Sequence, residues 1–510
     1  MKRLLVLTIL LSTFNLFGQK LKFKIIGQKD TTIHLVRYYG KNLYYADTAN
    51  IKGGEVEFDG SKQKPGILAV LLPGQKYFEF IYNNEEVNIE TIAPDFLVNM
   101  KVKKSEENRV FVDYMKFLGD KRKESDKLIA ERDKIKNQQD QAYKDFNSKL
   151  KLVSEEVLTY QNNLMAKNPT KLVSKIVKMS LDVEVPDPPR DKDGKIIDSL
   201  FQYKYYRSHF FDNIDLKDDR LVNTPIYQNR IELYFGKTMM IQHWDTVIKY
   251  GYEFLDRLDQ KSKAFEFCLT WVTSTYEKSN IMGMDKVFVK MAERYYCAKN
   301  SEGKSPAYWM PEDKLKDLCE KAATQKNIVL GLVPANISLR DTTDVNWKDF
   351  YSLKSDYTIL YFWDPECGHC KKTTPKLQQL YAQKLKARNI EVFAVAKAIG
   401  EDFVLWKKFI RDNNLTFINV GLTEALYKAA MQDARQFVPK YTTLEALNYS
   451  KTYDIYSTPR VFVLDKDKKI IAKQLSISQL EDFLDNAQNL KNVPKIIPPD
   501  KEEEEHMNEK

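Results

Sequence analysis

The segment YTILYFWDPECGHCK, residues 357–371, decides the fold of the C-terminal part of this 510-residue chain. Its first seven residues, Tyr357–Trp363, are almost all apolar, a pattern typical of a strand that is buried on both faces. Cys367-Gly368-His369-Cys370 follows and opens a helical pattern over 373–385. The three-residue spacing places both sulfurs on one side of the first helical turn, close enough to form a disulfide.

This position favours thiol chemistry. The N-terminus of a helix offers free N–H groups and a partial positive charge, and both stabilise a thiolate. The pKa of Cys367 is therefore expected below its ordinary value, which makes Cys367 a nucleophile at neutral pH. His369 adds positive charge when protonated, so the disulfide is expected to be more oxidising than one flanked by Gly-Pro. Cys367 is expected to be exposed and Cys370 half buried.

Metal binding is a weaker interpretation of the same pair. A zinc site would need a second pair of ligands at matching spacing, and the sequence contains none. We therefore expect no metal and no cofactor besides a redox-active disulfide between Cys367 and Cys370.

Strands and helices alternate outward from this segment. Buried-strand patterns cover 390–395, 417–420, 461–464 and 470–471, and helical patterns cover 403–411 and 480–484. This order predicts a mixed sheet covered by helices. Pro375 follows Cys370 by five residues, and Thr458-Pro459 precedes a strand nearly 90 residues further on.

Together these motifs resemble the thioredoxin superfamily, in its exported TlpA/ResA-like branch, with residues 331–336 as a similar lead-in. The resemblance implies a thioredoxin-like α/β domain over 328–490, in which Cys367 attacks and Cys370 resolves. It also implies that Pro459 is a cis-proline facing the disulfide and that the backbone of Thr458 binds substrate. Trp363, four residues before Cys367, is placed with them among the substrate-binding residues. The Gly-His pair between the cysteines resembles that of protein disulfide isomerases.

Two positions depart from that family. Thioredoxins carry a buried Asp six residues before the first cysteine, where this chain has Tyr361. ResA-like proteins carry a Glu three residues after the second cysteine, where this chain has Thr373. The usual proton acceptor for Cys370 is thus missing from both places, and Glu366 is expected to point to solvent. The sequence leaves the base unassigned.

The N-terminus resembles a secretory signal peptide. Met1-Lys2-Arg3 is basic, residues 4–11 are apolar, and Gly18 is a small residue at a plausible cleavage point. The apolar run is shorter than the roughly 20 residues that a membrane span needs. We therefore expect cleavage after residues 1–18, export to the periplasm or cell envelope, and no stable membrane span in the mature protein.

Two further domains are expected before the thioredoxin-like one, which gives a multidomain α+β protein. Residues 20–103 alternate in hydropathy between turn signals such as Gly53-Gly54, which predicts a small β-sandwich of about seven strands. Residues 104–327 are rich in charge and helical periodicity, with a long helix or helix pair over 106–163. This layout resembles exported Bacteroidetes-type thiol-disulfide proteins, whose first two segments are domains of unknown function. Residues 491–510 are expected to form a disordered acidic tail.

The remaining cysteines and histidines are interpreted as structural. Cys268 lies among aromatic residues and is expected in the core. Cys297 and Cys319 are able to pair, but two free thiols are the preferred interpretation. His209 and His243 have no second ligand at metal spacing and are expected to be structural.

The charge balance limits the partners. The chain has 80 basic and 71 acidic residues, a net charge of +9, and the two signs alternate along it. No basic stripe of the kind that binds nucleic acid is present in the sequence, so we expect no nucleic-acid partner. The expected partners are protein thiols and disulfides, together with a membrane thiol donor.

The preferred function is therefore a thiol-disulfide oxidoreductase of the cell envelope, similar to proteins of cytochrome c biogenesis. Whether it reduces disulfides, or forms and exchanges them, is open. One alternative is a thiol peroxidase, although Pro365 stands only two residues before Cys367, unlike the P-x-x-x-T-x-x-C pattern. The other is a non-enzymatic binding protein in which the Cys367–Cys370 disulfide is static.

Overall fold

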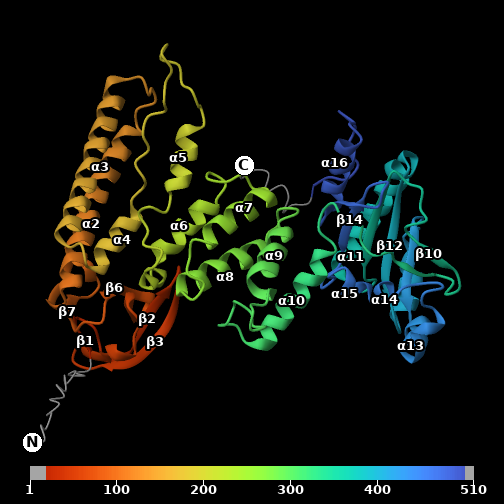
Figure 1. The fold of residues 1–510 in the computed structure, drawn as a ribbon, viewed down its shortest axis with the longest axis horizontal. Helices are drawn as coiled ribbons and strands as arrows, with labels where there is room; N and C mark the ends of the chain where they lie inside the picture. Colours follow the sequence, from red (N-terminus) through yellow and green to blue (C-terminus); the bar gives the residue numbers. More distant parts are fainter. Residues whose placement is uncertain (1–18, 500–510) are drawn as a thin grey trace, which may run out of the picture. The chain divides into compact units, whose positions relative to one another are not determined.

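The computed structural model, drawn in Figure 1, describes residues 19–499. These residues form two compact units. Unit 1 contains the described residues up to Gln242 and Tyr252–Cys268, and unit 2 contains His243–Gly251 and the described residues from Leu269 onward. The predicted signal peptide and residues 500–510 of the predicted tail lie outside the described residues. The three-domain division stays a prediction. No helix within residues 19–499 is long and apolar enough to cross a membrane.

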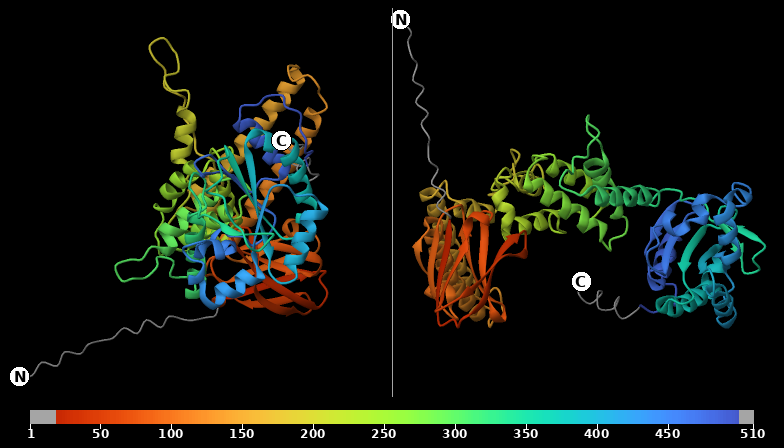
Figure 2. Two further views of the ribbon diagram at one scale, coloured as in Figure 1. Left: turned by 90° about the vertical axis from the view of Figure 1, so that its right-hand side faces the viewer. Right: turned by 90° about the horizontal axis from the view of Figure 1, so that it is seen from below.

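Unit 1 begins with the predicted β-sandwich, whose strands are drawn in red in Figure 2. One sheet has the order β4-β1-β7-β8 and the other β3-β2-β5-β6, so eight strands are present where about seven were expected. Alternate side chains of β1, among them Leu21 and Phe23, are buried, because successive strand residues point to opposite faces. Phe23 packs against Phe80 of the other sheet, with ring centroids 4.9 Å apart, so the two sheets share one core. The strands are β1 (Lys20–Ile26), β2 (Thr31–Tyr39), β3 (Asn42–Ile51), β4 (Glu55–Asp59), β5 (Gly66–Leu72), β6 (Lys76–Tyr82), β7 (Val87–Ile92) and β8 (Lys101–Lys104).

Helices follow the sandwich, and the predicted charged segment is a helix pair. Ser105 caps the first of these helices by accepting the N–H of Asn108. Cys268 is fully buried, as predicted, with its sulfur 3.5 Å from the Tyr227 hydroxyl. His209 stacks on Tyr205, which fits a structural role. The helices are α1 (Phe96–Asn99), α2 (Glu106–Arg132), α3 (Gln141–Lys167), α4 (Leu172–Ser180), α5 (Phe201–His209), α6 (Pro225–Phe235), α7 (Trp244–Leu255) and α8 (Lys263–Glu277), and the last two contribute residues to both units.

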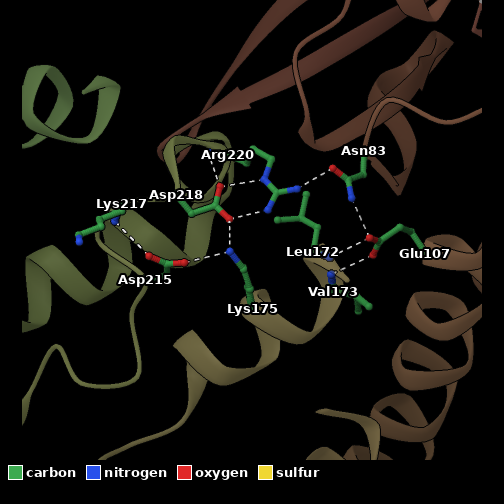
Figure 3. A network of polar contacts seen from close by, with 9 residues as sticks. All are labelled: Asn83, Glu107, Leu172, Val173, Lys175, Asp215, Lys217, Asp218 and Arg220. Atoms are coloured by element: carbon green, nitrogen blue, oxygen red, sulfur yellow. Dashed lines mark hydrogen bonds and ion pairs between the residues drawn. The ribbon is translucent and has the colours of Figure 1, made fainter. Parts of the chain in front are cut away.

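A buried polar network joins the sandwich to these helices (Figure 3). The Glu107 carboxylate accepts the N–H groups of Leu172 and Val173 at 2.7 and 3.0 Å, which satisfies free donors at the start of α4. Asn83 links Glu107 to the guanidinium of Arg220. The network therefore connects the turn after β6 with the start of α2 and the start of α4 by hydrogen bonds.

Asp218, at the far end of that network, is expected to make unit 1 sensitive to acid. Its carboxylate accepts hydrogen bonds from Arg220 and from the Lys175 ammonium, at 2.6 to 2.8 Å. Burial by itself raises the pKa of Asp218, but these hydrogen bonds outweigh burial and lower it from 3.8 to about 2. The folded-state pKa is below the unfolded one, so the stabilisation is present above about pH 4 and is lost as the pH falls from 4 to 2. Asp218→Asn is expected to cost about 2 kcal/mol at pH 7 and to flatten this dependence. Denaturant unfolding of the full chain between pH 2 and 7 checks both effects. Equal free energies of unfolding for the two proteins at pH 7 would contradict the first, and the same dependence on pH would contradict the second.

Unit 2 contains the predicted mixed sheet, which has seven strands in the order β10-β9-β13-β12-β11-β14-β15. Strand β11, the segment Tyr357–Trp363, lies near its centre, parallel to β12 and antiparallel to β14. Tyr361 and Trp363 face the apolar cluster under α11 (Gly368–Leu380) and α16 (Ile477–Ala487). Leu360 and Phe362 face the cluster under α13 (Glu424–Asp433) and α14 (Leu444–Leu447). Helices on both faces explain why β11 is apolar throughout. The strands are β9 (Ser338–Asp341), β10 (Trp347–Asp349), β11 (Tyr357–Trp363), β12 (Ile390–Ala398), β13 (Ile418–Thr423), β14 (Arg460–Leu464) and β15 (Ile470–Lys473).

The helices of this sheet confirm the predicted alternation. They are α11 (Gly368–Leu380), continued by η5 (Tyr381–Leu385), then α12 (Asp402–Asp412), α13 (Glu424–Asp433), α14 (Leu444–Leu447), α15 (Tyr449–Thr452) and α16 (Ile477–Ala487). The prediction that disorder starts at residue 491 is wrong. The N–H groups of Ile496 and Ile497 donate to the buried Glu481 at 2.9 Å, and Ile497 is 2% exposed. Residues 491–499 therefore pack against α16 rather than being disordered.

The prediction of free thiols at Cys297 and Cys319 is wrong, because the two form a disulfide. Cys297 ends η4 (Glu293–Cys297), which continues α9 (Asp285–Ala292), and Cys319 lies on α10 (Glu312–Lys326). The packing of α9 and α10 around Phe288 and Ala322 brings the two cysteines together. A sequence separation of 22 residues carries no sign of that packing.

Removing this disulfide is expected to destabilise unit 2. Closing a loop of 22 residues in the unfolded chain is worth about 3 kcal/mol in the chain-entropy description. The free energy of unfolding of the double variant Cys297→Ala, Cys319→Ala should therefore be about 3 kcal/mol lower, so the variant should unfold at a lower urea concentration. An unchanged midpoint in urea would show that the cross-link does not constrain the unfolded chain.

Candidate active site

Cys367 occupies the N-cap position of α11, after the loop that leaves the carboxyl end of β11. Its backbone N–H donates to the Asp364 carbonyl at 3.2 Å, and its own carbonyl accepts the N–H of Lys371 at 3.0 Å. The Cys367 side chain is half-buried, whereas Cys370 is fully buried one turn into the helix. The two sulfurs are not bonded to each other in this structure.

The two thiols differ in acidity. Burial by itself raises the pKa of Cys367, but hydrogen bonds from the backbone of Cys370 and His369 and from the side chains of Thr458 and Cys370 outweigh it and lower the pKa below the ordinary 9.0. Burial raises the pKa of Cys370 to about 12, and the neighbouring Cys367 adds to the rise. Near neutral pH, Cys367 is the thiol that ionises more readily, and the thiolate is the nucleophile.

Thr458 and Pro459 lie directly opposite the attacking sulfur. The Cys367 thiol donates to the Thr458 carbonyl, with 3.3 Å between sulfur and oxygen. The Thr458-Pro459 peptide bond is cis, as predicted. The structure therefore brings Thr458 and Pro459 to the two cysteines.

Two pockets meet at this peptide. Pro459 lines one, of about 270 Å³, together with the exposed His369 and Thr373. Thr458 lines the other, of about 230 Å³, with Trp363 in its wall.

Trp363 does not fit its predicted role as a direct substrate contact. Its side chain is 1% exposed and packs against Phe409, with ring centroids 5.2 Å apart. The last residue of a strand that is covered on both faces is buried with the rest of the strand. Trp363 therefore shapes the pocket from within the core.

Tyr361 and Thr373 occupy the positions where a carboxylate was missing from the sequence. The Tyr361 hydroxyl lies 2.8 Å from the Thr374 hydroxyl, and burial raises the pKa of Tyr361 far above its ordinary value. Tyr361 is therefore neutral and offers no base. Glu366 is exposed, as expected.

A charged group that sequence reasoning missed lies at the edge of the second pocket. The Lys397 ammonium is 2.9 Å from the Asp402 carboxylate and 3.8 Å from that of Asp364. Lys397 follows Ala396, which is paired in register with Trp363. The carboxyl ends of neighbouring parallel strands meet at one edge of a sheet, and this rule would have found Lys397 from the sequence.

Residues 355–470 match the family model described as thioredoxin-like, and residues 20–111 match one described as a domain of unknown function. The C-terminal domain of this chain belongs to the thioredoxin-like family. The thioredoxin-like domain and the uncharacterised N-terminal domain both agree with the resemblance found in the sequence.

Several known proteins are similar to part of this chain. Thiol-disulfide oxidoreductases ResA of Bacillus thuringiensis and Bacillus cereus are each 26% identical to this chain over 143 residues, 28% of its length. The chain spans 66% of the length of these curated relatives.

Solved structures from Bacteroidetes are similar too. A domain of a possible thiol-disulfide isomerase from Cytophaga hutchinsonii is 34% identical, with 32% of this chain and 94% of that chain covered and a TM-score of 0.25. A thioredoxin-like protein from Bacteroides caccae is 15% identical, with 59% of this chain and 97% of that chain covered and a TM-score of 0.41.

Proposed function

We propose that this protein is an exported thiol-disulfide oxidoreductase that acts on protein disulfides in the cell envelope. Cys367 is the attacking thiol and Cys370 the resolving thiol. The observation that carries the proposal is the asymmetry of the pair: a half-buried Cys367 with a lowered pKa next to a fully buried Cys370 with a pKa raised to about 12.

The reaction in the reducing direction has two exchange steps. The Cys367 thiolate attacks one sulfur of a substrate disulfide, a mixed disulfide forms, and the other substrate sulfur leaves as a thiolate that takes up a proton. Cys370 then loses its proton and attacks the Cys367 sulfur, which releases the second substrate thiol and leaves a Cys367–Cys370 disulfide. One disulfide is reduced and one is formed. A thiol donor, proposed to be membrane-bound, then reduces the Cys367–Cys370 disulfide and returns the pair to the dithiol state.

Thr458 and Pro459 are proposed to bind the substrate backbone, and His369 to act electrostatically from the solvent side of the pair. The Thr458 carbonyl already accepts the Cys367 thiol proton, so an extended substrate chain pairing with Thr458 would bring its sulfur next to Cys367. The exposed His369 lies beside Pro459 in the same pocket, where a positive charge would favour the Cys367 thiolate.

The direction of the reaction is decided by the reduction potential. A potential near about −270 mV would support a reductase, and one near about −120 mV an oxidase. Equilibration of the purified protein with glutathione buffers, followed by alkylation of free thiols, measures it. If mild reductant does not reduce the Cys367–Cys370 disulfide, the result would instead support a static disulfide.

Export and cleavage are proposed from residues 1–18. The mass and N-terminal sequence of the protein recovered from the producing cells test this, and an N-terminus at Met1 would contradict it.

A further inference from the structure

A third pocket of unit 2, of about 470 Å³, lies between α10 and the loop that leads to Thr458. We propose that this pocket binds a basic segment of the substrate polypeptide whose disulfide is exchanged at Cys367. The inference rests on the proposed function and adds to it a class of substrate. The side chains that carry the argument are Glu277, Asp317, Glu320, Lys321, Asp454 and Tyr456.

The pocket is continuous with the candidate active site. Tyr456 lines both this pocket and the one beside Thr458, and it is 81% exposed. It stands two residues before Thr458, and an extended chain advances about 3.3 Å per residue. A substrate that pairs with Thr458 therefore needs only a few more residues to pass over Tyr456 into the pocket.

The charge of the pocket points to the chemistry of its occupant. It contains four carboxylates, those of Glu277, Asp317, Glu320 and Asp454, and two ammonium groups. Lys321 is neutralised by Glu277 at 2.6 Å, and Lys451 lies 3.7 Å from Glu320.

Two carboxylates form no ion pair among the described residues, although Asp454 lies near enough to Lys321 to help raise the pKa of its ammonium. Asp454 accepts only from the neutral amide of Gln325, at 2.7 Å, and among the described residues Asp317 has no ion-pair partner. The excess of negative charge favours a lysine or arginine. The Lys321 ammonium already lies 5.9 Å from the centre of the Tyr456 ring, so it is the carboxylates that favour a basic occupant.

The walls of the pocket are held in place before any substrate arrives. The Cys297–Cys319 disulfide fixes α10 to η4, and the Gln325 amide joins α10 to Asp454 in the loop. The ammonium of Lys473, on β15, pairs with Asp285 of α9 and donates to the Ile328 carbonyl at 2.9 Å. A preformed site loses less conformational freedom on binding than a mobile one.

The test uses the full-length protein and two disulfide-bonded peptides. The peptides differ at one position about three residues from the cysteine, which is Lys in one and Glu in the other. Wild-type protein is expected to react with the Lys peptide about tenfold faster in kcat/KM, and the preference should shrink at high salt. Asp317→Asn is expected to reduce the ratio about threefold, and Asp317→Lys to reverse the preference. Glu312→Gln removes the same charge from α10 outside the pocket, so it should leave the ratio unchanged.

Equal reactivity of the two peptides with wild-type protein, or a ratio that Asp317→Lys does not change, would overturn the inference. A small neutral disulfide tested on the wild-type protein separates this failure from failure of the proposed function. Exchange with the small disulfide but no peptide preference rejects the basic-segment site alone. No exchange with any of the three disulfides rejects the oxidoreductase itself.

Discussion

Cys367→Ser is expected to abolish disulfide exchange, with a loss in kcat/KM on the order of a thousandfold or more, because no other described thiol is placed to attack. Cys268 is fully buried with its pKa raised to about 12, and Cys297 and Cys319 are bonded to each other. Cys370→Ser should instead retain the first step. Cys367 still attacks, but the mixed disulfide is not resolved and accumulates.

The measurement is the reaction of each variant with a disulfide-bonded protein, followed on non-reducing gels and by mass spectrometry. Wild-type protein should turn over, Cys370→Ser should give a covalent adduct at Cys367, and Cys367→Ser should give neither. Equal trapping by both single variants would refute the division of roles between an accessible and a buried thiol. Consumption of hydrogen peroxide with a thiol donor would favour the peroxidase alternative.

Glu481→Gln is expected to destabilise unit 2 by about 3 kcal/mol, because it leaves a buried cation with an incomplete set of partners. Glu481 is fully buried on α16 and accepts the ammonium of Lys384 at 2.6 Å, and the Lys384 side chain is 5% exposed. Asp485 also contacts Lys384, at 2.7 Å, so one partner remains. The same carboxylate accepts the N–H groups of Ile496 and Ile497, so the packing of residues 491–499 should loosen together with the helix.

Asp482→Asn is the matched control, since it removes the same charge one residue further along α16. Asp482 is 56% exposed and pairs with Lys495 at the surface, where an ion pair is worth about 0–1 kcal/mol. Urea unfolding of the two variants and the wild type gives the difference directly. Equal stabilities of the two variants would show that the buried cluster contributes no more than a surface pair.

Much of the candidate site could be predicted from short stretches of sequence. The apolar run Tyr357–Trp363, the Cys-x-x-Cys spacing after it and the Thr458-Pro459 pair each determine local structure: a buried strand, a helix N-terminus and a cis peptide bond. The partial exposure of Cys367 and the burial of Cys370 fit the same pattern, because Cys367 is the N-cap at the end of the loop and Cys370 lies one turn further into α11, in the buried cluster.

Other features depended on long-range packing. The Cys297–Cys319 bond arises where α9 and α10 pack together, and the order of residues 491–499 arises from a carboxylate on α16. The burial of Trp363 depends on α12 covering its ring with Phe409. None of these contacts has a local signature, because each joins residues whose separation in the sequence carries no periodic pattern.

The sequence alone thus determined the order of sandwich, helices and mixed sheet, since hydropathy period and turn residues are local properties of the chain. It also determined the thiol pair, whose chemistry depends on a strand end, a helix start and a three-residue spacing. Only the tertiary structure decided which groups surround that pair: the Thr458 carbonyl at 3.3 Å, Lys397 from the neighbouring strand, and Tyr456 shared with the acidic pocket on α10. Those groups come from distant parts of the chain, and they meet because the sheet and the packing of α10 bring them to one place.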